Sequence, residues 1–204
     1  MSAASRRGRL IVFEGGEASG KSTQARRLAR RIGAHLSFEP GATPVGKRIR
    51  RIVLGTDTLH LDPRAEALLI AADRAQHVAE VLEPRLAEGT DVVSDRYIGS
   101  SLAYQGFGRG LGVDEVRQMS TWATGGLLPD AVVLLEVSAE TAAARLKGER
   151  DRMEREERSF HERVRYGFTR LAETEQHWVV VDANADRKTV DARVDRALNR
   201  LLGL

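Results

Sequence analysis

The segment Gly15–Ser22 holds the residues of this chain whose types and spacing fit phosphate chemistry most closely. It reads G-x-x-x-x-G-K-S and follows the apolar run Leu10–Phe13. Glycines at its two ends let the backbone curl around phosphate oxygens, and Lys21 brings a positive charge toward the β- and γ-phosphates. The Ser22 hydroxyl is of the kind that ligates Mg²⁺ beside a nucleotide. The pattern predicts binding of a nucleoside triphosphate.

This loop is expected to lie between a buried strand and a helix. The helix that we expect over Lys21–Ile32 presents its positive N-terminal end to the same anion. A chance match in a glycine-containing loop is the alternative, and the strand before and helix after the loop count against it. The residues expected to contact ATP are Gly15, Gly16, Glu17, Ala18, Ser19, Gly20, Lys21, Ser22 and Thr23.

Apolar strands and helical stretches alternate along the chain, which is typical of a parallel sheet with helices on both faces. Strands are expected at Leu10–Glu14, His35–Glu39, Asp91–Asp95, Ala131–Val137 and Trp178–Asp182. Helices are expected at Lys21–Ile32, Pro44–Leu54, Pro63–Glu88 (with Pro84 as a kink or stop), Val113–Ala123, Ala139–Lys147, Arg155–Glu175 and Lys188–Leu202. The expected fold is a three-layer α/β/α domain with a five-stranded parallel sheet over residues 9–204, after a disordered basic tail at residues 1–8.

Composition excludes several classes of function. The chain has no cysteine, which excludes disulfides and thiolate metal sites and fits a reducing cytoplasm. Its histidines are scattered without an i, i+4 pair, so a zinc site is not expected. No apolar stretch approaches the roughly 20 residues of a membrane span. The basic N-terminus lacks the apolar core of a secretory signal. We therefore expect a cytoplasmic protein without a membrane partner.

The net charge of +3 hides a local bias toward arginine. Nucleic-acid binding is one interpretation of such a bias. However, basic residues alternate with acidic ones, as in Arg145–Glu154, and no aromatic stacking platform accompanies them. Arginines gathered around small phosphates explain the pattern better, so no nucleic-acid partner is expected.

Polar residues at the carboxyl ends of the strands are the next candidates, because ligands gather at that edge of a parallel sheet. Asp95 follows an apolar strand and resembles the acid that holds Mg²⁺, usually through water. Arg96 beside it can grip a phosphate bidentately. A helix cap or a turn is the alternative role for Asp95. The phosphate loop and Arg96 together favour the functional role.

A family resemblance rests on segments that occur in a particular order and spacing: the phosphate loop, Glu39–Thr43, Ala71–His77, Asp95–Tyr97 and Ser100–Gly106. From about Leu10 to the C-terminus the chain resembles bacterial thymidylate kinase, a P-loop nucleoside monophosphate kinase, in its lid-arginine type. The block from Asp-Arg-Tyr to Ala-Tyr-Gln-Gly is far more specific than the phosphate loop. The resemblance implies transfer of the γ-phosphoryl group of ATP, with Mg²⁺, to dTMP, which gives dTDP and ADP for dTTP synthesis.

The resemblance also implies roles in substrate binding. Glu17 would accept a hydrogen bond from the nucleotide 3′-hydroxyl, the alternative being a loop carboxylate without a partner. Arg74 would donate to a thymine carbonyl from the helix face that it shares with Ile70. Ser101 would reach the ring N–H, and Tyr104 would crowd the 2′ position and exclude ribonucleotides. The expected substrate-binding residues are Glu17, Pro40, Ile70, Arg74, Arg96, Ser101, Tyr104 and Gln105.

A lid at about residues 145–157 is implied to complete the catalytic site. The phosphate-loop interior Gly16–Ser19 has no basic residue, so the lid must supply the arginine that covers the transferring group. Arg150 and Arg152 are the first candidates, with Arg145 and Lys147 behind them; a solvated, charged helix end is the alternative. The expected catalytic residues are Lys21, Asp95, Arg96, Arg150 and Arg152, and the expected metal site is Ser22 with Asp95.

Two positions depart from the family pattern. Phe38 stands where relatives commonly carry an arginine for the monophosphate, and Ile70 stands where they often stack a phenylalanine on thymine. The missing stack would cost about 0.5–1.5 kcal/mol and the missing phosphate contact about 1.5–3 kcal/mol. Arg48 or Arg51 is predicted to replace the phosphate contact. The departures leave two alternatives open: a kinase for another nucleoside or nucleotide, and a nucleotide-binding protein that has lost turnover.

Members of this family are usually homodimers. The apolar faces of Ala65–Val81 and Val113–Ala123 could supply an interface that is the same on both subunits. We therefore expect a homodimer built on these two helices.

Overall fold

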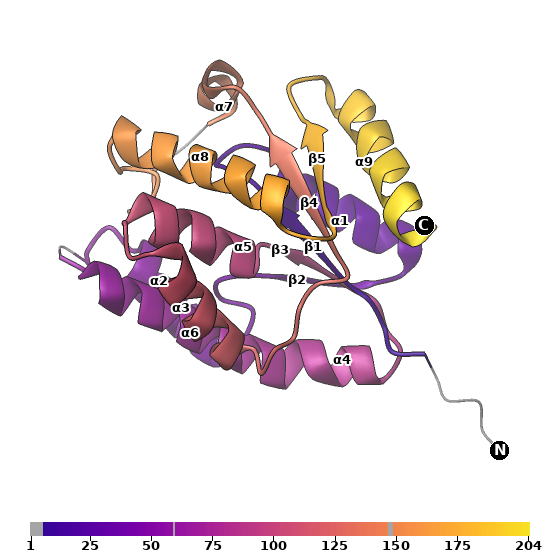
Figure 1. Ribbon diagram of the computed structural model, residues 1–204, viewed down its shortest axis with the longest axis horizontal. Helices are drawn as coiled ribbons and strands as arrows, with labels where there is room; N and C mark the ends of the chain where they lie inside the picture. The colour runs from indigo at the N-terminus through magenta and orange to yellow at the C-terminus, as the bar shows by residue number, and fades with distance from the viewer. Residues whose placement is uncertain (1–5, 59, 147–148) are drawn as a thin grey trace.

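The chain forms a five-stranded, all-parallel sheet in the order β2-β3-β1-β4-β5 (Figure 1). The computed structural model describes residues 6–58, 60–146 and 149–204. The strands are β1 Leu10–Glu14, β2 His35–Phe38, β3 Val92–Asp95, β4 Ala131–Glu136 and β5 Trp178–Asp182. This arrangement confirms the predicted fold class.

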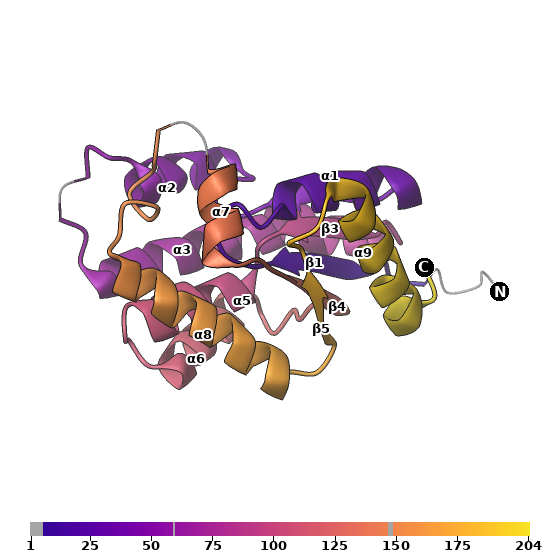
Figure 2. The same ribbon diagram turned by 90° about the horizontal axis from the view of Figure 1, so that it is seen from above.

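Helices connect the strands and cover both faces of the sheet. They are α1 Lys21–Ile32, α2 Pro44–Leu54, α3 Pro63–His77, α4 Glu83–Ala87, α5 Ile98–Ser101, α6 Val113–Ala123, α7 Ala139–Arg145, α8 Arg158–Thr174 and α9 Arg187–Leu202, with π-helical stretches η1 Val78–Leu82 and η2 Leu102–Gly108. Figure 2 shows α1 and α9 together over one face, while α3, α5, α6 and α8 lie over the other. The three layers follow from strands that are apolar on both sides.

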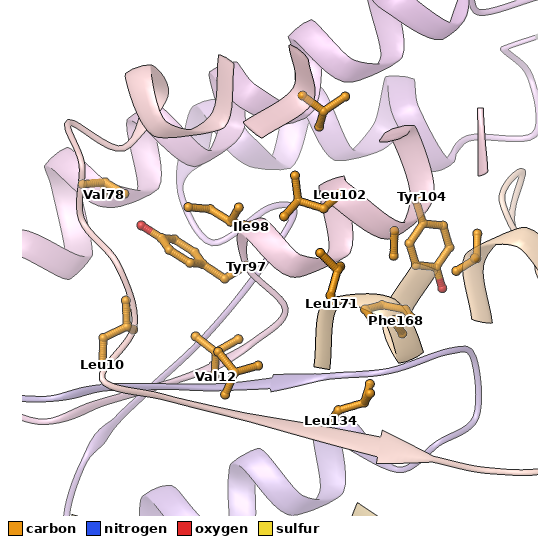
Figure 3. Packing of buried hydrophobic residues seen from close by; sticks show 14 of the residues in the cluster. Leu10, Val12, Val78, Tyr97, Ile98, Leu102, Tyr104, Leu134, Phe168 and Leu171 are labelled. Atoms are coloured by element: carbon orange, nitrogen blue, oxygen red, sulfur yellow. The ribbon is translucent and has the colours of Figure 1, made fainter. Parts of the chain in front are cut away.

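The central strand β1 divides the core between the two faces. Ile11 and Phe13 pack among residues of α1 and α9. Leu10 and Val12 pack on the opposite face with the larger cluster, which includes Tyr97 and Phe168 (Figure 3). Alternate side chains of a strand point to opposite faces, so one apolar run supports both layers.

The register of the strands brings their carboxyl ends to one edge. Phe13 of β1 lies beside Asp95 of β3, and Asp95 lies beside Phe38 of β2. Glu14 at the end of β1 lies beside Leu134 of β4. The loops after these strands therefore open into a common space, as expected for a parallel sheet.

The predicted elements match the structure closely, with the main differences around two segments and small shifts at the ends of several other elements. The predicted helix Pro63–Glu88 widens into the π-helical η1 just before Pro84, whose ring nitrogen has no hydrogen to donate. No helix was predicted between residues 98 and 108, where α5 and η2 lie. The last long helices also start at slightly different residues, at Arg158 and Arg187. The predicted end of the Ala139 helix, at Lys147, lies outside the described residues.

The N-terminal segment is partly packed against the domain. Residues 1–5 of the predicted tail lie outside the described part of the chain, but Gly8 N–H donates to the Leu86 carbonyl at 2.8 Å. Arg9 pairs with Asp91 at 2.6 Å. None of the helices in the described part of the chain is both long and apolar enough to cross a membrane.

Candidate active site

A cavity of about 660 Å³ opens at the carboxyl edge of the sheet. It is lined by the phosphate loop, the end of β2, part of α3, the loop after β3, and part of η2. Most residues predicted for the site line it: Glu17, Ala18, Gly20, Lys21, Ser22, Thr23, Pro40, Ile70, Arg74, Asp95, Arg96, Ser101, Tyr104 and Gln105. The fold therefore gathers into one space side chains that are far apart in the sequence.

The phosphate loop turns sharply from β1 into α1. Gly15 has φ 142°, and a Cβ there would lie 2.5 Å from the Leu135 carbonyl oxygen, so only glycine fits. The loop ends where α1 begins at Lys21, whose Nζ donates to the Gly16 carbonyl at 2.6 Å and to Ser19 Oγ at 3.3 Å. Lys21 is therefore held against the loop, and the positive N-terminal end of α1 points toward the cavity.

Lys21 is buried beside both positive and negative groups. Burial and the charge of Arg96 lower its pKa to about 8, although Glu17, Asp95 and Glu14 act in the opposite direction. An anion that entered the cavity would stabilise the charged form of Lys21. This residue is therefore suited to holding phosphate.

Ser22 and Asp95 meet at the floor of the loop. The Ser22 hydroxyl donates to Asp95 Oδ2. The other carboxylate oxygen, Oδ1, is buried and has no hydrogen-bond partner among the described residues. An oxygen pair of this kind fits a divalent cation that completes its shell with phosphate oxygens and water. Within the described residues no cluster of three or more acids, histidines or cysteines offers a site built by protein alone.

Arg96 is the centre of a charged cluster with Glu17 and Tyr104. Arg96 Nη2 lies 2.8 Å from Glu17 Oε1, and the Tyr104 hydroxyl donates to the same oxygen at 2.6 Å. The guanidinium carbon lies 5.1 Å from the centre of the Tyr104 ring. Burial raises the pKa of Glu17, but the charges of Arg96 and Lys21 and the Tyr104 hydrogen bond bring it down to about 2. Glu17 is therefore an ionised, partnered residue, unlike the alternative considered from sequence.

Glu14 is connected to this cluster through Ser100. It is fully buried; its Oε1 accepts the N–H groups of Tyr97 and Ser100, each at 3.0 Å, and its Oε2 accepts the Ser100 hydroxyl at 2.6 Å. Ser100 Oγ in turn accepts from Arg96 Nη1 at 3.0 Å. A Cβ at Gly99 would lie 2.9 Å from Glu14 Oε1, so the close approach requires glycine. Burial raises the pKa of Glu14 to about 7, against the lowering effects of Ser100 and Arg96.

The residues Ile70, Arg74, Ser101 and Gln105 form one side of the cavity, which we call the acceptor wall. Arg74 is 1% exposed, and it donates through Nη1 to Ser101 Oγ and through Nη2 to the Tyr97 carbonyl, each at 3.0 Å. Ile70 lies one helical turn before it. The predicted proximity of these residues is therefore present in the structure.

Behind the wall, Glu39 holds Arg74 in place. Arg74 Nε donates to Glu39 Oε2 at 2.8 Å, and His77 Nδ1 lies 2.9 Å from Glu39 Oε1. Burial opposes ionisation of Glu39, but the charge of Arg74 and the contacts of His77 hold its pKa below its usual value. Glu39 is a site residue that was not predicted, although its position directly after a strand, before proline and glycine, is a signal that the sequence offers.

Phe38 lines the cavity near Pro40 and is 43% exposed. Arg50 lines the same cavity and donates to the Pro40 carbonyl at 2.8 Å. Arg48 and Arg51, predicted to compensate for Phe38, are exposed and are not among the lining residues. Of the three arginines on α2, Arg50 is the one that lines the cavity.

The lid arginines divide among three places. Arg145 lines the main cavity and donates to the Ala185 carbonyl at 3.1 Å. Arg150 lines a second cavity of about 760 Å³, which shares Glu17 with the first. Arg152 instead directs its guanidinium to Glu66 and the Val53 carbonyl, and it lines neither cavity. Lys147 lies outside the described residues.

Comparison with known proteins agrees with this geometry. The family model described as thymidylate kinase matches residues 13–194. A thymidylate kinase from Leifsonia xyli subsp. xyli (strain CTCB07) is 47% identical over 197 residues, which cover 93% of this chain and 93% of that protein. A thymidylate kinase from Halothermothrix orenii is 41% identical over 92% of this chain and 95% of its own length. One from Cutibacterium acnes is 43% identical over 96% and 98%. The chain therefore belongs to the thymidylate kinase family.

Proposed function

We propose that this chain transfers the γ-phosphoryl group of ATP to dTMP and so forms dTDP and ADP. The observation that carries the proposal is that the phosphate loop, Arg96 and the acceptor wall open into one cavity. A donor held by the loop and an acceptor held by the wall would face each other across Arg96. The alternatives left open by Phe38 and Ile70 are not favoured, because the family match is nearly full-length and the loop and Arg96 are intact.

On the donor side, Lys21 and the start of α1 hold the phosphates of ATP. We assign the divalent cation to Mg²⁺, held by the Ser22 hydroxyl and the free oxygen of Asp95. When bound, Mg²⁺ would neutralise charge on the phosphate oxygens. The Gly15–Thr23 segment provides the backbone around the triphosphate. We place this reaction in the cytoplasm, which suits a chain without cysteine.

On the acceptor side, the wall holds thymine through Arg74 and Ser101, with Ile70 beneath the ring. Arg74 already donates to four protein groups, namely Glu39, Ser101, Ser120 and the Tyr97 carbonyl, so it offers its one remaining N–H from a fixed position. Glu17 receives the 3′-hydroxyl, and the Tyr104 ring fills the space that a 2′-hydroxyl would need. Pro40 and Gln105 complete the pocket.

Catalysis consists of positioning and charge neutralisation, because the attacking oxygen of dTMP is already anionic and needs no strong base. Lys21 and Arg96 hold the two phosphates in line, and Arg50 adds a contact to the acceptor phosphate beside Phe38. Arg150, with Arg145 behind it, reaches the transferring group when the lid closes. Closure also excludes water, which would otherwise accept the phosphoryl group.

We also propose a homodimer through α3 and α6, which pack against each other. Leu68 on α3 is 60% exposed and Trp122 on α6 is 85% exposed, and both are large apolar side chains. Large apolar side chains left this exposed on two neighbouring helices favour a surface that another protein covers. Light scattering should give twice the chain mass, and Trp122→Glu should give the mass of a single chain; a wild-type monomer at micromolar concentration would refute the proposal.

A panel of acceptors tests the proposed reaction. ADP release is measured with ATP and Mg²⁺ against dTMP, dUMP, dCMP, dGMP, thymidine and no acceptor. We expect the highest turnover with dTMP. Another preferred acceptor would move the assignment to a different nucleotide kinase, and ATP binding without ADP release would show that the chain has lost turnover.

A further inference from the structure

Glu66 of α3 is a fully buried carboxylate that lies outside both cavities and collects hydrogen bonds from several elements. Gln105 Nε2 donates to its Oε1 at 2.9 Å. Arg109 Nη2 donates to its Oε2 at 2.9 Å, and Arg152 Nη2 donates to that same oxygen. One side chain therefore joins α3, the end of η2, and the lid.

Arg152 is held from a second side by the end of α2. Its Nε donates to the Val53 carbonyl at 2.7 Å, and its backbone N–H donates to the Leu54 carbonyl at 3.1 Å. The next residue, Met153, is 6% exposed, belongs to the larger core cluster and lines the main cavity. The segment 150–156, which we call the lid segment, is thus anchored at its middle.

Arg109 makes a second contact between the lid segment and the rest of the protein. Its Nη2 also lies 2.6 Å from Glu156 Oε1, and its guanidinium carbon lies 4.6 Å from the centre of the Phe160 ring. Arg109, Arg152, Glu66 and Glu156 balance two positive charges with two negative ones. Both arginines have only 14% of their side chains exposed, and removing Glu66 would leave Arg109 paired with Glu156 while taking from Arg152 the carboxylate that it contacts.

Glu66 is ionised in this setting. Burial on its own would raise its pKa, but the hydrogen bonds from Arg109, Arg152 and Gln105 together hold the pKa below its usual value. Charge-assisted bonds are about twice as strong as neutral ones, so the contacts depend on this ionised form.

We propose that Glu66 is a positioning residue that fastens the lid segment to the acceptor wall. Glu66 lies one helical turn before Ile70 and two before Arg74 on α3, and Gln105 belongs to both the wall and the Glu66 cluster. Arg152 acts through Glu66 to hold the lid segment, which leaves Arg150 and Arg145 to approach the phosphates. This inference rests on the proposed function in one respect: the wall that receives the lid is the one assigned to dTMP.

The functional consequence concerns water. A lid segment that is fastened beside the acceptor keeps solvent from the transferring group. A lid segment that is released would admit water, so ATP would be hydrolysed without forming dTDP. A rise in the ratio of ADP to dTDP therefore shows that the lid segment is no longer held in place. A loss of fold stability alone would lower both products together.

The test uses Glu66→Gln, which keeps the side-chain size and removes the charge. We expect the ADP-to-dTDP ratio to rise from near one, and trypsin cleavage at Arg150, Arg152 or Arg155 to accelerate about tenfold at a temperature where the variant is folded. Asp91→Asn is the matched control, because it breaks another arginine–carboxylate contact, with Arg9, outside both cavities. The control should leave both the ratio and the cleavage rate unchanged.

A double-variant cycle separates Arg152 as a positioning residue from Arg152 as a catalytic one. If Arg152 acts through Glu66, then Arg152→Gln and the double variant resemble Glu66→Gln in ratio and in kcat. A folded Glu66→Gln with unchanged ratio and cleavage, or a kcat loss confined to Arg152→Gln, overturns the proposal. Neither result touches the proposed function, which fails only if the wild-type protein makes no dTDP; the cleavage assay reads the fastening even then.

Discussion

The acceptor wall and the lid arginines differ in how far contacts within the protein fix them. Arg74 is 1% exposed and donates to Glu39, Ser101 and the Tyr97 carbonyl. Arg145, by contrast, makes one hydrogen bond to a carbonyl oxygen and is exposed, as is Arg150. Under the proposed function, this contrast means that recognition of the acceptor is built into the folded protein, whereas the arginine side chains that cover the transferring phosphate have to move into place.

The largest effect should come from the residue between the two regions. Arg96→Ala removes the cation that would bridge both phosphates, and we expect kcat to fall by about 10³-fold or more, since arginines on transferring phosphoryl groups contribute that much. The fold should survive, because Arg96 sits at the cavity rather than in the core. Steady-state kinetics and thermal unfolding measure the two effects. A variant with nearly full turnover would show that Arg96 does not touch the reaction.

Removing an arginine from the acceptor wall should destabilise the protein far more than removing one from the lid segment. Arg74→Ala leaves Glu39 as a buried charge with only His77 beside it, so the free energy of unfolding should fall by about 3–5 kcal/mol. Arg150→Ala should change stability by less than about 0.5 kcal/mol while lowering kcat. Urea unfolding of both variants checks this contrast, and equal losses of stability would refute it.

Glu14 links the phosphate loop to Arg96, and its effect should depend on pH. Its pKa is raised from 4.5 to about 7, so its contribution to stability is complete below pH 4.5 and is lost as pH rises through 7. The glutamine in Glu14→Gln cannot ionise, so the stability of this variant does not fall with pH for this reason. The stability of wild type relative to Glu14→Gln should therefore fall by up to about 3 kcal/mol between pH 5 and pH 8. If the difference in stability between the two proteins stays constant across this range, burial does not favour the neutral form of Glu14 and the prediction is wrong.

The smallest predicted effect concerns Phe38, at the open end of the wall. Phe38→Arg adds a cation beside Pro40 and Arg50, where the acceptor phosphate is expected. The KM for dTMP should fall, by about tenfold at most, because Arg50 already supplies a contact there. The KM for ATP is the internal control and should not change. An unaltered KM for dTMP in Phe38→Arg, with a raised one in Arg50→Ala, would show that Arg50 suffices.

Local patterns made the fold and the phosphate loop predictable. The bounds of β1, β5, α1, α2 and α6 agree with the prediction, because apolar runs, glycines and prolines mark them in the sequence. The helical stretch over residues 98–108 carries three glycines and no clear period, so its π-helical form follows from tertiary packing against α8. Element type was thus predictable where the signal was local.

The buried carboxylates were the part of the site that the sequence concealed. Glu14, Glu39 and Glu66 each pair with groups far along the chain, and Glu66 meets Arg152 across 86 positions. Nothing in the spacing of single residues reports such a pairing. For the same reason the sequence could nominate the lid arginines but could not indicate which of them is held by Glu66 and which faces a cavity.

The most direct test of a prebuilt acceptor wall beside movable arginine side chains is the affinity of dTMP, measured by calorimetry with and without a non-hydrolysable ATP analogue and Mg²⁺. We expect that dTMP binds without the donor, that the donor changes its Kd by less than about fivefold, and that Arg150→Ala leaves this Kd unchanged. Binding of dTMP only after the donor is present would contradict it, because the wall would then be assembled by the lid rather than by the fold.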